Sequence, residues 1–440
     1  MTALELRLRQ ALQPWRAARA WRIAFSGGLD SSVLLHLLAD LARREDLPPL
    51  RAIHVHHGLQ AAADTWPEHC ARVCQRLGIA LDTVRVRVAP GASLEQAARR
   101  ARYQAFAERL EPGEVLLSAQ HRDDQAETLL FRLLRGAGVR GLAAMPSSRA
   151  LGQGSLVRPL LSCSRAELQA YAQDQGVVWI EDPSNADERF SRNFLRHQVI
   201  PLLAERWPQV VTSLARSAAH QTESRQLLDE LAEMDLCAAR GVPAFSWLAL
   251  PSLQLSALAA LSDARQRNLL RHWLAPLTRM PDQDHWAGWR DLRDADIDAT
   301  PIWKLADGEL HRADGRLWWL GGEWLGTPES IDLSADLCSQ PLALPGNGHV
   351  QVLGELPPGR WRLRYRQGGE SLQVPGRGRR DLKRLLNELR VPAFVRPRLP
   401  LLFDGDELVA VANLTQSSVI EASGAHVRWS PPIGVQGLSW

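Results

Sequence analysis

Short apolar runs alternate with amphipathic segments from about residue 20 to residue 200. The run WRIAF precedes a helix predicted over 31–41, and three further pairs repeat that order. Strand followed by helix, four times over, predicts an α/β fold with a mostly parallel sheet. Ligands of such sheets bind beyond the carboxyl ends of the strands, so the residues after each strand are candidates for chemistry. The further pairs are LRAIHVHHG with TWPEHCARVCQRLG, IALDTVRVRV with SLEQAARRARYQAFAERL, and EVLLSA with DDQAETLLFRLLRG.

The pattern changes after residue 210. A long helix is predicted over 213–240, and one or two helices over 253–277 precede a β-like stretch, 303–320, with two Asp-Gly turn signals. The Pro- and Gly-rich passage 339–359 predicts a linker or a loop-rich segment. Two predicted strands, WRLRYR and ELVAVAN, then flank a short helix, RDLKRLLNELR. We therefore predict three domains: an α/β domain over 1–210, a mostly helical domain over 211–330 and a small basic α+β domain over 345–440.

The composition is that of a globular protein with more than one domain. The chain has 440 residues, a length greater than one hydrophobic core usually serves. Its fractions of apolar residues, 45%, and charged residues, 23%, are ordinary for a globular protein. No apolar stretch approaches the roughly 20 residues that cross a bilayer, and the first residues, MTALELRLRQ, lack a signal peptide's apolar segment. We expect a cytoplasmic protein without a membrane partner. Five scattered cysteines without a CxxC pair disfavour a disulfide framework or a cysteine zinc site.

The stretch between the first apolar run and its helix, SGGLDS, suits a phosphate group. Gly27 and Gly28 allow a sharp turn and a close backbone approach, and the amides at the start of a helix attract anions. Ser26 and Ser31 can add hydroxyl donors, and Asp30 can hold a metal ion that bridges phosphates. The Walker A lysine and the GxGxxG pattern are both absent. A short SGG alone is more often an ordinary capped turn.

The full string, placed between a strand and an amphipathic helix, resembles the PP-loop, SGGxDS, of the N-type ATP pyrophosphatases. Members of that superfamily cleave ATP between its α and β phosphates and adenylate a substrate. The resemblance implies a Rossmann-like catalytic domain whose loop binds ATP through Ser26, Gly27, Gly28, Leu29, Asp30 and Ser31.

Two further stretches resemble the same superfamily. HVHHGLQ ends the second predicted strand, where the resemblance places His56 or His57 close to the nucleotide. Without it, such histidines are more often packed or solvent-facing than metal ligands. ARRARY puts Arg99 and Arg102 three positions apart on one helical face, and exposed arginines there are usually only solvated. The resemblance implies that one of the two faces the ATP phosphates and stabilises the leaving pyrophosphate.

Carboxylates follow the fourth predicted strand, in SAQHRDDQAET. His121, Asp124 and Glu127 are spaced by three and share a helical face at the ligand end of the sheet. Asp123 alone would complement the helix dipole, so the two further carboxylates are available to grip a cation, such as an amino group or Mg²⁺. HxxDQAET followed by RGAGxxGLxxM resembles the tRNA(Ile)-lysidine synthases.

Later stretches resemble that family as well. They are EDPSN…RNxxR, from Glu181 onward, and the passage 368–411, although this chain has GGES where the family more often reads GER. Residues 360–400 carry twelve Arg or Lys against three acids, a stripe nine charges positive in a chain of net charge +3, which is typical of a nucleic-acid surface. Arginines at helical spacing after Glu181 fit either a solvated face or a clamp on AMP or RNA phosphate. The candidate tRNA- or AMP-binding residues are Arg189, Arg192, Asn193, Arg196, Arg377, Arg379, Arg380, Lys383 and Arg384.

The family resemblance implies a two-step reaction on a minor isoleucine tRNA whose CAU anticodon begins with cytidine. ATP, with Mg²⁺ held by Asp30, adenylates O2 of that cytidine, and the ε-amine of free L-lysine then attacks C2 and expels AMP. The product, lysidine, switches the tRNA from Met to Ile identity. The resemblance assigns catalysis to Asp30, Arg99 and Asp124, and lysine binding to Asp124 and Glu127. The two later domains would bind the tRNA, and a homodimer stays open.

Two other functions stay open on the residues alone. Another PP-loop tRNA enzyme, such as a thiolase, would need paired cysteines, and Cys70 and Cys74 form a CxxxC pair in a predicted amphipathic helix. A non-catalytic tRNA-binding protein with a decayed loop is disfavoured by the intact SGGLDS. The sequence does not decide which acidic residue deprotonates the lysine amine, or which of Arg99 and Arg102 faces the phosphates.

Overall fold

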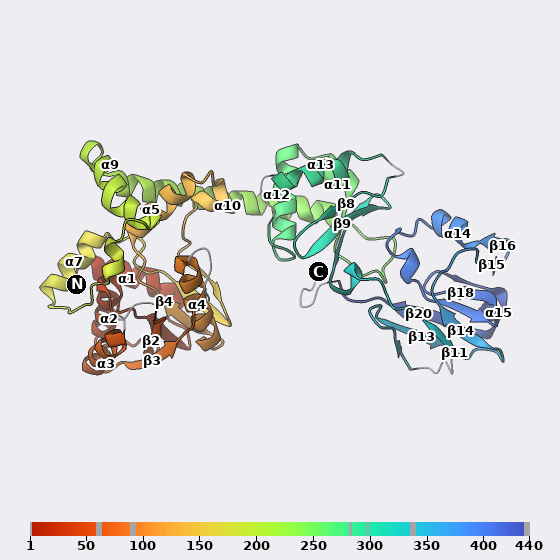
Figure 1. Cartoon of the computed structure of the whole chain (residues 1–440), viewed down its shortest axis with the longest axis horizontal. Helices are drawn as coiled ribbons and strands as arrows, with labels where there is room; N and C mark the ends of the chain where they lie inside the picture. Colours follow the sequence, from red (N-terminus) through yellow and green to blue (C-terminus); the bar gives the residue numbers. More distant parts are fainter. Residues whose placement is uncertain are drawn as a thin grey trace. The chain divides into compact units, whose positions relative to one another are not determined.

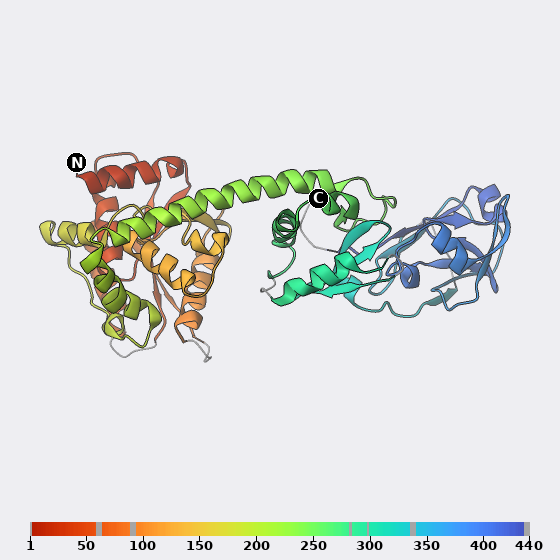
Figure 2. The same cartoon turned by 90° about the horizontal axis from the view of Figure 1, so that it is seen from above.

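The computed structural model describes residues 2–58, 64–88, 94–280, 284–296, 299–334 and 340–434. They form two compact units, one up to residue 227 and one from residue 228 onward. Helix α10 (Val210–Arg240) crosses this division, and Figure 2 shows it as one unbroken helix. Each unit has its own hydrophobic cores. The boundaries of the three predicted domains stay predictions.

The first unit is built on a six-stranded sheet of order β3-β2-β1-β4-β6-β5 (Figure 1). Neighbouring strands are parallel except β6 with β5, so the predicted α/β fold is confirmed, including all four strand–helix pairs. The strands are β1 (Ala20–Ala24), β2 (Leu50–His56), β3 (Ala80–Arg85), β4 (Glu114–Leu117), β5 (Ser148–Leu151) and β6 (Gly154–Val157). The helices are α1 (Ala3–Leu12), α2 (Leu29–Ala42), α3 (Trp66–Leu77), α4 (Leu94–Arg109), α5 (Arg122–Leu133), α6 (Val139–Leu142), α7 (Arg165–Asp174), α8 (Ser191–Phe194) and α9 (Ile200–Arg206), with shorter turns η1 (Gln13–Trp15), η3 (Pro183–Ala186) and η4 (Leu195–Val199).

Helices cover both faces of this sheet because its central strands are apolar at successive positions. Val115 and Leu117 of β4 belong to the core under α1, α2, α3 and α7, whereas Leu116 packs with Phe106 of α4. Successive side chains of a strand point to opposite faces, so a continuously apolar strand is buried on both. Figure 1 shows α1, α2 and α3 on the opposite side of the sheet from α4. The carboxyl ends of the parallel strands consequently meet at one end of the sheet.

The second unit combines helices with three sheets of order β7-β10-β9-β8, β11-β14-β17-β18-β15-β16 with β19 on β18, and β12-β13-β20. Strand β10 contributes to two cores, because Trp319 packs with the helices and Trp318 packs with the C-terminal strands. The helices are α10, α11 (Leu255–Ala259), α12 (Asp263–Leu274), α13 (Ala287–Asp294), α14 (Leu382–Glu388) and α15 (Ser418–Ser423), with turns η5 (Asp284–Trp286), η6 (Gly322–Leu325) and η7 (Arg396–Arg398). The strands are β7 (Ser252–Gln254), β8 (Ile302–Lys304), β9 (Gly308–Ala313), β10 (Arg316–Gly321), β11 (Asp332–Ser334), β12 (Leu342–Ala343), β13 (His349–Leu353), β14 (Trp361–Arg364), β15 (Ser371–Val374), β16 (Gly378–Asp381), β17 (Leu401–Asp404), β18 (Glu407–Val411), β19 (Thr415–Gln416) and β20 (His426–Ser430).

The passage predicted as a linker or loop-rich segment contains two strands. β13 pairs with both β12 and β20, and its Val350 and Val352 are buried in the core of the C-terminal strands. The alternation in HVQVL is a strand period, but Pro and Gly residues on both sides obscure it. Those residues mark turns at the ends of the strand and not a linker. The second predicted Asp-Gly turn is confirmed, since Asp314 and Gly315 join β9 to β10 with φ of 48° and 67°.

The cysteines form no disulfide among the described residues. Cys70, Cys74 and Cys163 are buried thiols and Cys237 is an exposed thiol, while Cys338 lies outside the described residues. Burial raises the pKa of the Cys70 thiol to about 12 and that of Cys74 to about 11. Both thiols are therefore protonated at neutral pH and poorly reactive. In the part of the chain that the structure describes, no helix is both long and apolar enough to cross a membrane.

Arg398 joins two parts of the second unit. Its guanidinium is almost fully buried, lies 5.0 Å from the Trp324 ring and donates hydrogen bonds to the carbonyl oxygens of Glu323, Gly326 and Gly346. Glu323 and Trp324 belong to η6, whereas Arg398 ends η7 of the C-terminal region. One of the twelve basic residues in the sequence stripe is thus structural and does not contribute to a surface.

We predict that Arg398→Ala lowers the free energy of unfolding of the second unit by about 2–4 kcal/mol, because three carbonyl groups lose a charged donor and a buried side chain is removed. Urea unfolding followed by tryptophan fluorescence measures this loss. Arg360→Ala is the matched control, since Arg360 is exposed and its hydrogen bonds, to the Asp404 carboxylate and from the Gly405 N–H, are made by its backbone. Equal stability of the two variants would show that Arg398 does not hold the two parts together.

Candidate active site

The predicted PP-loop connects β1 to the start of α2, and its own hydroxyl groups hold its shape. The backbone N–H of Ser26 donates to Ser31 Oγ at 3.2 Å, and the two serine hydroxyls lie 2.9 Å apart. Ser31 Oγ also donates to the carbonyl of Gly28, the residue that precedes the first turn of the helix. The loop therefore presents the amino-terminal end of α2, whose unpaired N–H groups suit an anion.

Gly27 cannot carry a side chain at this point of the loop. Its φ is +86°, and a Cβ atom would lie 3.0 Å from Ile180 Cδ1 and 3.1 Å from Cys70 Sγ. Its carbonyl oxygen accepts a hydrogen bond of 2.8 Å from the backbone N–H of Ile180. Ile180 immediately precedes the EDPSN stretch, so that stretch is held against the loop although about 150 residues separate them.

His121 lies among three carboxylates at the carboxyl end of β4. Its Nε2 is 3.5 Å from an oxygen of Asp30 and 3.5 Å from one of Asp124, and its Nδ1 is 3.6 Å from Asp123. Burial alone would lower the pKa of His121, but the carboxylates, Asp123 and Asp30 first, raise it to about 10. The imidazole is therefore a cation at neutral pH. It links the PP-loop to α5.

Arg196 bridges the two carboxylates predicted to bind lysine. Its Nε donates to Glu127 at 2.6 Å, and its Nη2 donates to Glu127 at 2.9 Å and to Asp124 at 3.1 Å. Burial raises the pKa of Glu127 despite the Arg196 partner. Arg196 lies on η4, a π-helical turn between α8 and α9, which changes the direction in which side chains leave the helix. The structure thus brings Asp124 and Glu127 together around one cation, as their spacing predicts.

The three histidines of HVHHG have different surroundings. His54 is buried, donates a hydrogen bond of 2.9 Å from Nδ1 to the Phe25 carbonyl oxygen and lies 3.5 Å from Cys70 Sγ, which makes it a core residue. His56 Nε2 lies 3.4 Å from Asp64. Burial lowers the pKa of His57, and the charge of Arg102 lowers it further.

Another arginine of ARRARY, Arg99, lies over an aromatic ring. The guanidinium of Arg99 lies 4.9 Å from the centre of the Tyr103 ring, and that of Arg149 lies 5.1 Å from the same ring. Tyr103 packs against the core under α4, so this ring fixes the position of both cations. Burial raises the pKa of Tyr103, but the charges of Arg99, Arg158 and Arg102 lower it. Arg99 and Arg102, predicted on one face, therefore act on the same tyrosine, and Arg102 also lowers the pKa of His57.

The candidates after Glu181 differ in role. Asn193 donates two hydrogen bonds, 2.8 Å to the Ser184 carbonyl and 2.9 Å to the Asp187 carbonyl, so its amide nitrogen shapes the EDPSN loop. Arg189 is exposed and pairs with Asp187 at 2.7 Å. Arg192 has no ion-pair partner among the described residues. Of this group, only Arg196 reaches the predicted lysine site.

The five basic candidates of the C-terminal region are all exposed. Arg377 pairs with Glu388 at 2.6 Å, and Arg379 donates to Ser371 Oγ at 2.7 Å. The five candidates lie on the turn before β16, on β16 itself and on the first turn of α14, the short helix that follows. The five are Arg377, Arg379, Arg380, Lys383 and Arg384.

The corner where this chain departs from the family pattern is ordered by Glu370. Its carboxylate accepts hydrogen bonds from the backbone N–H groups of Gln367, at 2.5 Å, and Gly368, at 2.7 Å. Gly368 and Gly369 both have positive φ, so a charged side chain closes a glycine turn here.

Asp30 was predicted to hold Mg²⁺, and the structure gives it one available oxygen. Its Oδ1 is buried without a hydrogen-bond partner, while its Oδ2 faces His121. Magnesium is commonly held by one or two carboxylates together with substrate phosphates, and Asp30 fits that donor set. Among the described residues, no group of three His, Cys, Asp or Glu side chains is arranged to hold a metal ion by itself.

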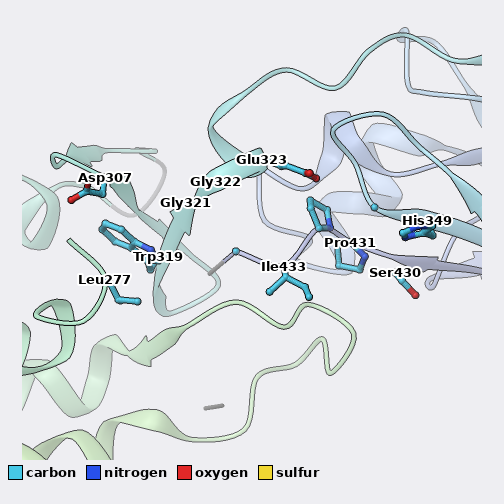
Figure 3. A pocket seen from close by; sticks show the side chains of 13 residues that line it. Leu277, Asp307, Trp319, Gly321, Gly322, Glu323, His349, Ser430, Pro431 and Ile433 are labelled. Atoms are coloured by element: carbon cyan, nitrogen blue, oxygen red, sulfur yellow. The ribbon is translucent and has the colours of Figure 1, made fainter. Parts of the chain in front are cut away.

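A cavity of about 630 Å³ lies in the second unit and contains none of the predicted site residues (Figure 3). Trp319, Glu323 and His349 are among the residues that line it. The carboxylate of Asp307, which also lines it, already accepts hydrogen bonds from Thr278 and the Arg279 backbone. Asp30, His121, Asp124, Glu127 and Arg196 gather where β1 and β4 end, and we call this end of the sheet the catalytic edge. These charged groups make the first unit the better candidate site.

Besides the bridging role of Arg196, sequence reasoning missed the role of two residues at this edge. His121 was placed on the shared face but received no role, and its charge depends on carboxylates from α2 and α5 that only the fold brings together. Arg158 was not singled out, although the position directly after β6 is where site residues of a parallel sheet are expected.

Three family models match the chain: a PP-loop domain over residues 1–203, a TilS substrate binding domain over 253–318 and a TilS substrate C-terminal domain over 361–430. The chain is 62% identical to a tRNA(Ile)-lysidine synthase of Pseudomonas fluorescens, over 99% of this chain and 98% of that relative. It is 60% identical to one of Pseudomonas aeruginosa, over 99% of both. A solved U34-tRNA thiolase of Methanococcus maripaludis with its [4Fe-4S] cluster is 18% identical, with a TM-score of 0.43, over 50% of this chain and 78% of that one.

The likeness to the thiolase is too small to bear on function. The identity to the two Pseudomonas proteins extends over nearly the full length of both chains, and it agrees with the PP-loop at β1 and the acid pair on α5. The chain therefore belongs to the family of tRNA(Ile)-lysidine synthases.

Proposed function

We propose that the chain forms lysidine on the minor isoleucine tRNA with a CAU anticodon, using ATP and free L-lysine. The observation that carries this proposal is the acid pair on α5, which grips one cationic group beside an ATP-type phosphate loop. A phosphate loop next to an amine site fits an enzyme that activates one substrate with ATP and then joins an amine to it.

The nucleotide side lies at β1 and β2. The residues from Ser26 to Ser31 cradle the phosphates at the start of α2, and Asp30 would hold Mg²⁺, which supplies charge neutralisation to the phosphates. Arg102, near His57, is better placed than Arg99 to neutralise the leaving pyrophosphate. His56 ends β2 and is a further candidate contact of the nucleotide.

Asp124 and Glu127 hold the amino groups of lysine. A guanidinium already occupies both carboxylates in the structure, so an ammonium group of the substrate would take over part of that ion pair. Arg196 would then be released toward the carboxylate of the amino acid, because a guanidinium pairs with carboxylates in a planar fork.

The attacking ε-amine must lose a proton before it reacts, because free lysine is protonated near neutral pH. His121 cannot accept that proton while it remains an imidazolium with a pKa of about 10. The carboxylates of the same cluster remain as acceptors. Among them the pKa of Glu127 is raised by burial, which makes it a stronger base than an ordinary carboxylate.

The rival thiolase reaction would need a reactive cysteine pair, which Cys70 and Cys74 do not supply. Cys70 and Cys74 are buried in α3, and the pKa of each thiol is raised, to about 12 and about 11. Sulfur transfer uses a thiolate, which neither residue supplies at neutral pH.

We further propose that the protein acts in the cytoplasm and that two copies of the chain can associate. Analytical ultracentrifugation of the full chain would test the association.

The central test is incubation of the purified full-length protein with ATP, labelled lysine and the minor isoleucine tRNA. Label enters the tRNA only when ATP is present if the proposal is correct, and AMP is released with it. Binding of the tRNA without incorporation, or transfer of sulfur in place of lysine, would refute the proposal.

Asp124→Asn tests the lysine site. We predict that kcat/KM for lysine falls on the order of 100-fold, because one charged hydrogen bond to an ammonium group is lost. Adenylation, measured as tRNA-dependent exchange between pyrophosphate and ATP, is partly retained. Asp174→Asn is the control, since Asp174 is exposed at the end of α7. An equal loss in both steps would place Asp124 at the nucleotide instead.

The charge of His121 predicts a dependence of stability on pH. The pKa of His121 is about 10 in the folded protein and 6.5 in the unfolded chain, so the protonated imidazole stabilises the folded state. This contribution is complete below about pH 6.5 and is lost as the pH rises through about 10. The maximal slope is about 1.4 kcal/mol per pH unit. We predict that His121→Gln removes this component between pH 7 and pH 10. Hydrogen exchange in peptides that cover β4 and α5 measures the local stability, and equal pH dependence in both proteins would contradict the assignment.

A further inference from the structure

Arg158 is a buried cation at the catalytic edge of the first unit. It directly follows β6, and only 4% of its surface is exposed. Its Nη1 donates to the carbonyl oxygen of Pro146 at 2.6 Å, but its Nε has no hydrogen-bond partner. A buried charge without an opposite charge is unfavourable unless a ligand supplies the missing partner.

The groups around Arg158 add positive charge. Its side chain interacts with the Tyr103 hydroxyl, and the guanidinium groups of Arg99 and Arg149 lie over the same Tyr103 ring. Burial lowers the pKa of Arg158, and Arg149 and Arg99 lower it further, against the raising effect of Tyr103. Within the residues that the structure describes, none of the three arginines has an ion-pair partner. We call Tyr103, Arg99, Arg149 and Arg158 the Tyr103 cluster.

The order of strands places Arg158, the buried member of this cluster, away from the PP-loop. The PP-loop follows β1 and His57 follows β2, whereas Arg158 follows β6, on the other side of β4. Two strand spacings, about 10 Å, separate β1 from β6. The acid pair on α5, which begins after β4, lies between them. Along this end of the sheet, the proposed nucleotide site at β1 is therefore followed by the amine site after β4 and then by Arg158 of the Tyr103 cluster after β6.

The neighbours of the cluster extend the positive region. Arg99 and Arg192 both lower the pKa of Arg132 on α5, after the larger effect of burial. Arg192 lies on α8, close to the EDPSN loop. The Tyr103 cluster and the arginines near it consequently attract an anion, whereas the neighbouring acid pair on α5 repels it.

We propose that the Tyr103 cluster binds a phosphate group of the tRNA backbone next to the reacting cytidine and so holds that base between the nucleotide and the lysine amine. This inference rests on the proposed function for the identity of the RNA. Guanidinium groups bind phosphate in a bidentate manner, and contacts to phosphates position a nucleic acid without reading its sequence. Pyrophosphate carries the same chemistry and is the other possible source of the anion.

The test measures tRNA binding by the full-length protein without ATP, over a series of salt concentrations, for Arg158→Gln and Arg149→Gln. Arg149 is exposed, so its variant keeps the test valid if Arg158→Gln fails to fold. Each variant should raise the Kd for tRNA about tenfold and lower the slope of log K against log salt by about one. Arg158→Lys should recover only part of the affinity, because it restores the charge without the fork.

Arg100→Gln is the matched control, because Arg100 is exposed on α4 next to Arg99 in sequence. It should bind tRNA like the unaltered protein. The KM for ATP and inhibition by pyrophosphate should be unchanged in all variants. A shift in those two quantities with unchanged tRNA binding would assign the cluster to pyrophosphate and overturn the proposal, as would no change in any of them. Lysine incorporation by the unaltered protein is a separate measurement, so failure of the proposed function is distinguished from failure of this inference.

Discussion

The catalytic edge depends on how four carboxylates are kept together. Asp30, Asp123, Asp124 and Glu127 meet where β1 and β4 end, and like charges at such distances repel unless cations are placed among them. Two cations, His121 and Arg196, compensate half of that charge, so the site keeps an affinity for further positive groups. Lysine, the amine substrate that we propose, carries two ammonium groups and one carboxylate and would supply further positive charge.

The same compensation explains why distant segments converge. Arg196 comes from a helix that follows the EDPSN stretch, and Ile180 before that stretch is hydrogen-bonded to Gly27 of the PP-loop. Because the acid pair requires Arg196 in the structure, the position of η4 is tied to α5, and the EDPSN loop is tied to both. The predicted PP-loop and the acid pair that we propose as the amine site are thus parts of one packed arrangement.

Much of this could be predicted from the sequence, because the signals are local. Strand and helix periods, the glycines of the PP-loop and the spacing of Asp124 and Glu127 lie within short windows. The bridging role of Arg196 could not be predicted, since 69 residues separate it from Glu127 and a π-helical turn sets its direction. The buried position of Arg398 inside a basic stripe is likewise set by packing. β13 was missed because Pro and Gly at its ends masked a two-residue period.

Charge is sorted along the sheet edge, and this sorting constrains the order of the bound groups. The acidic centre attracts an amine and repels phosphate, whereas the Tyr103 cluster, with Arg158 two strands from β1, carries three arginines without an ion-pair partner among the described residues. In the arrangement that we propose, an RNA backbone has a favourable path on the β6 side and the nucleotide has one on the β1 side. A base held between the two would face the α-phosphate from one direction and the lysine amine from the other. The two proposed chemical steps would then use one binding position for the RNA.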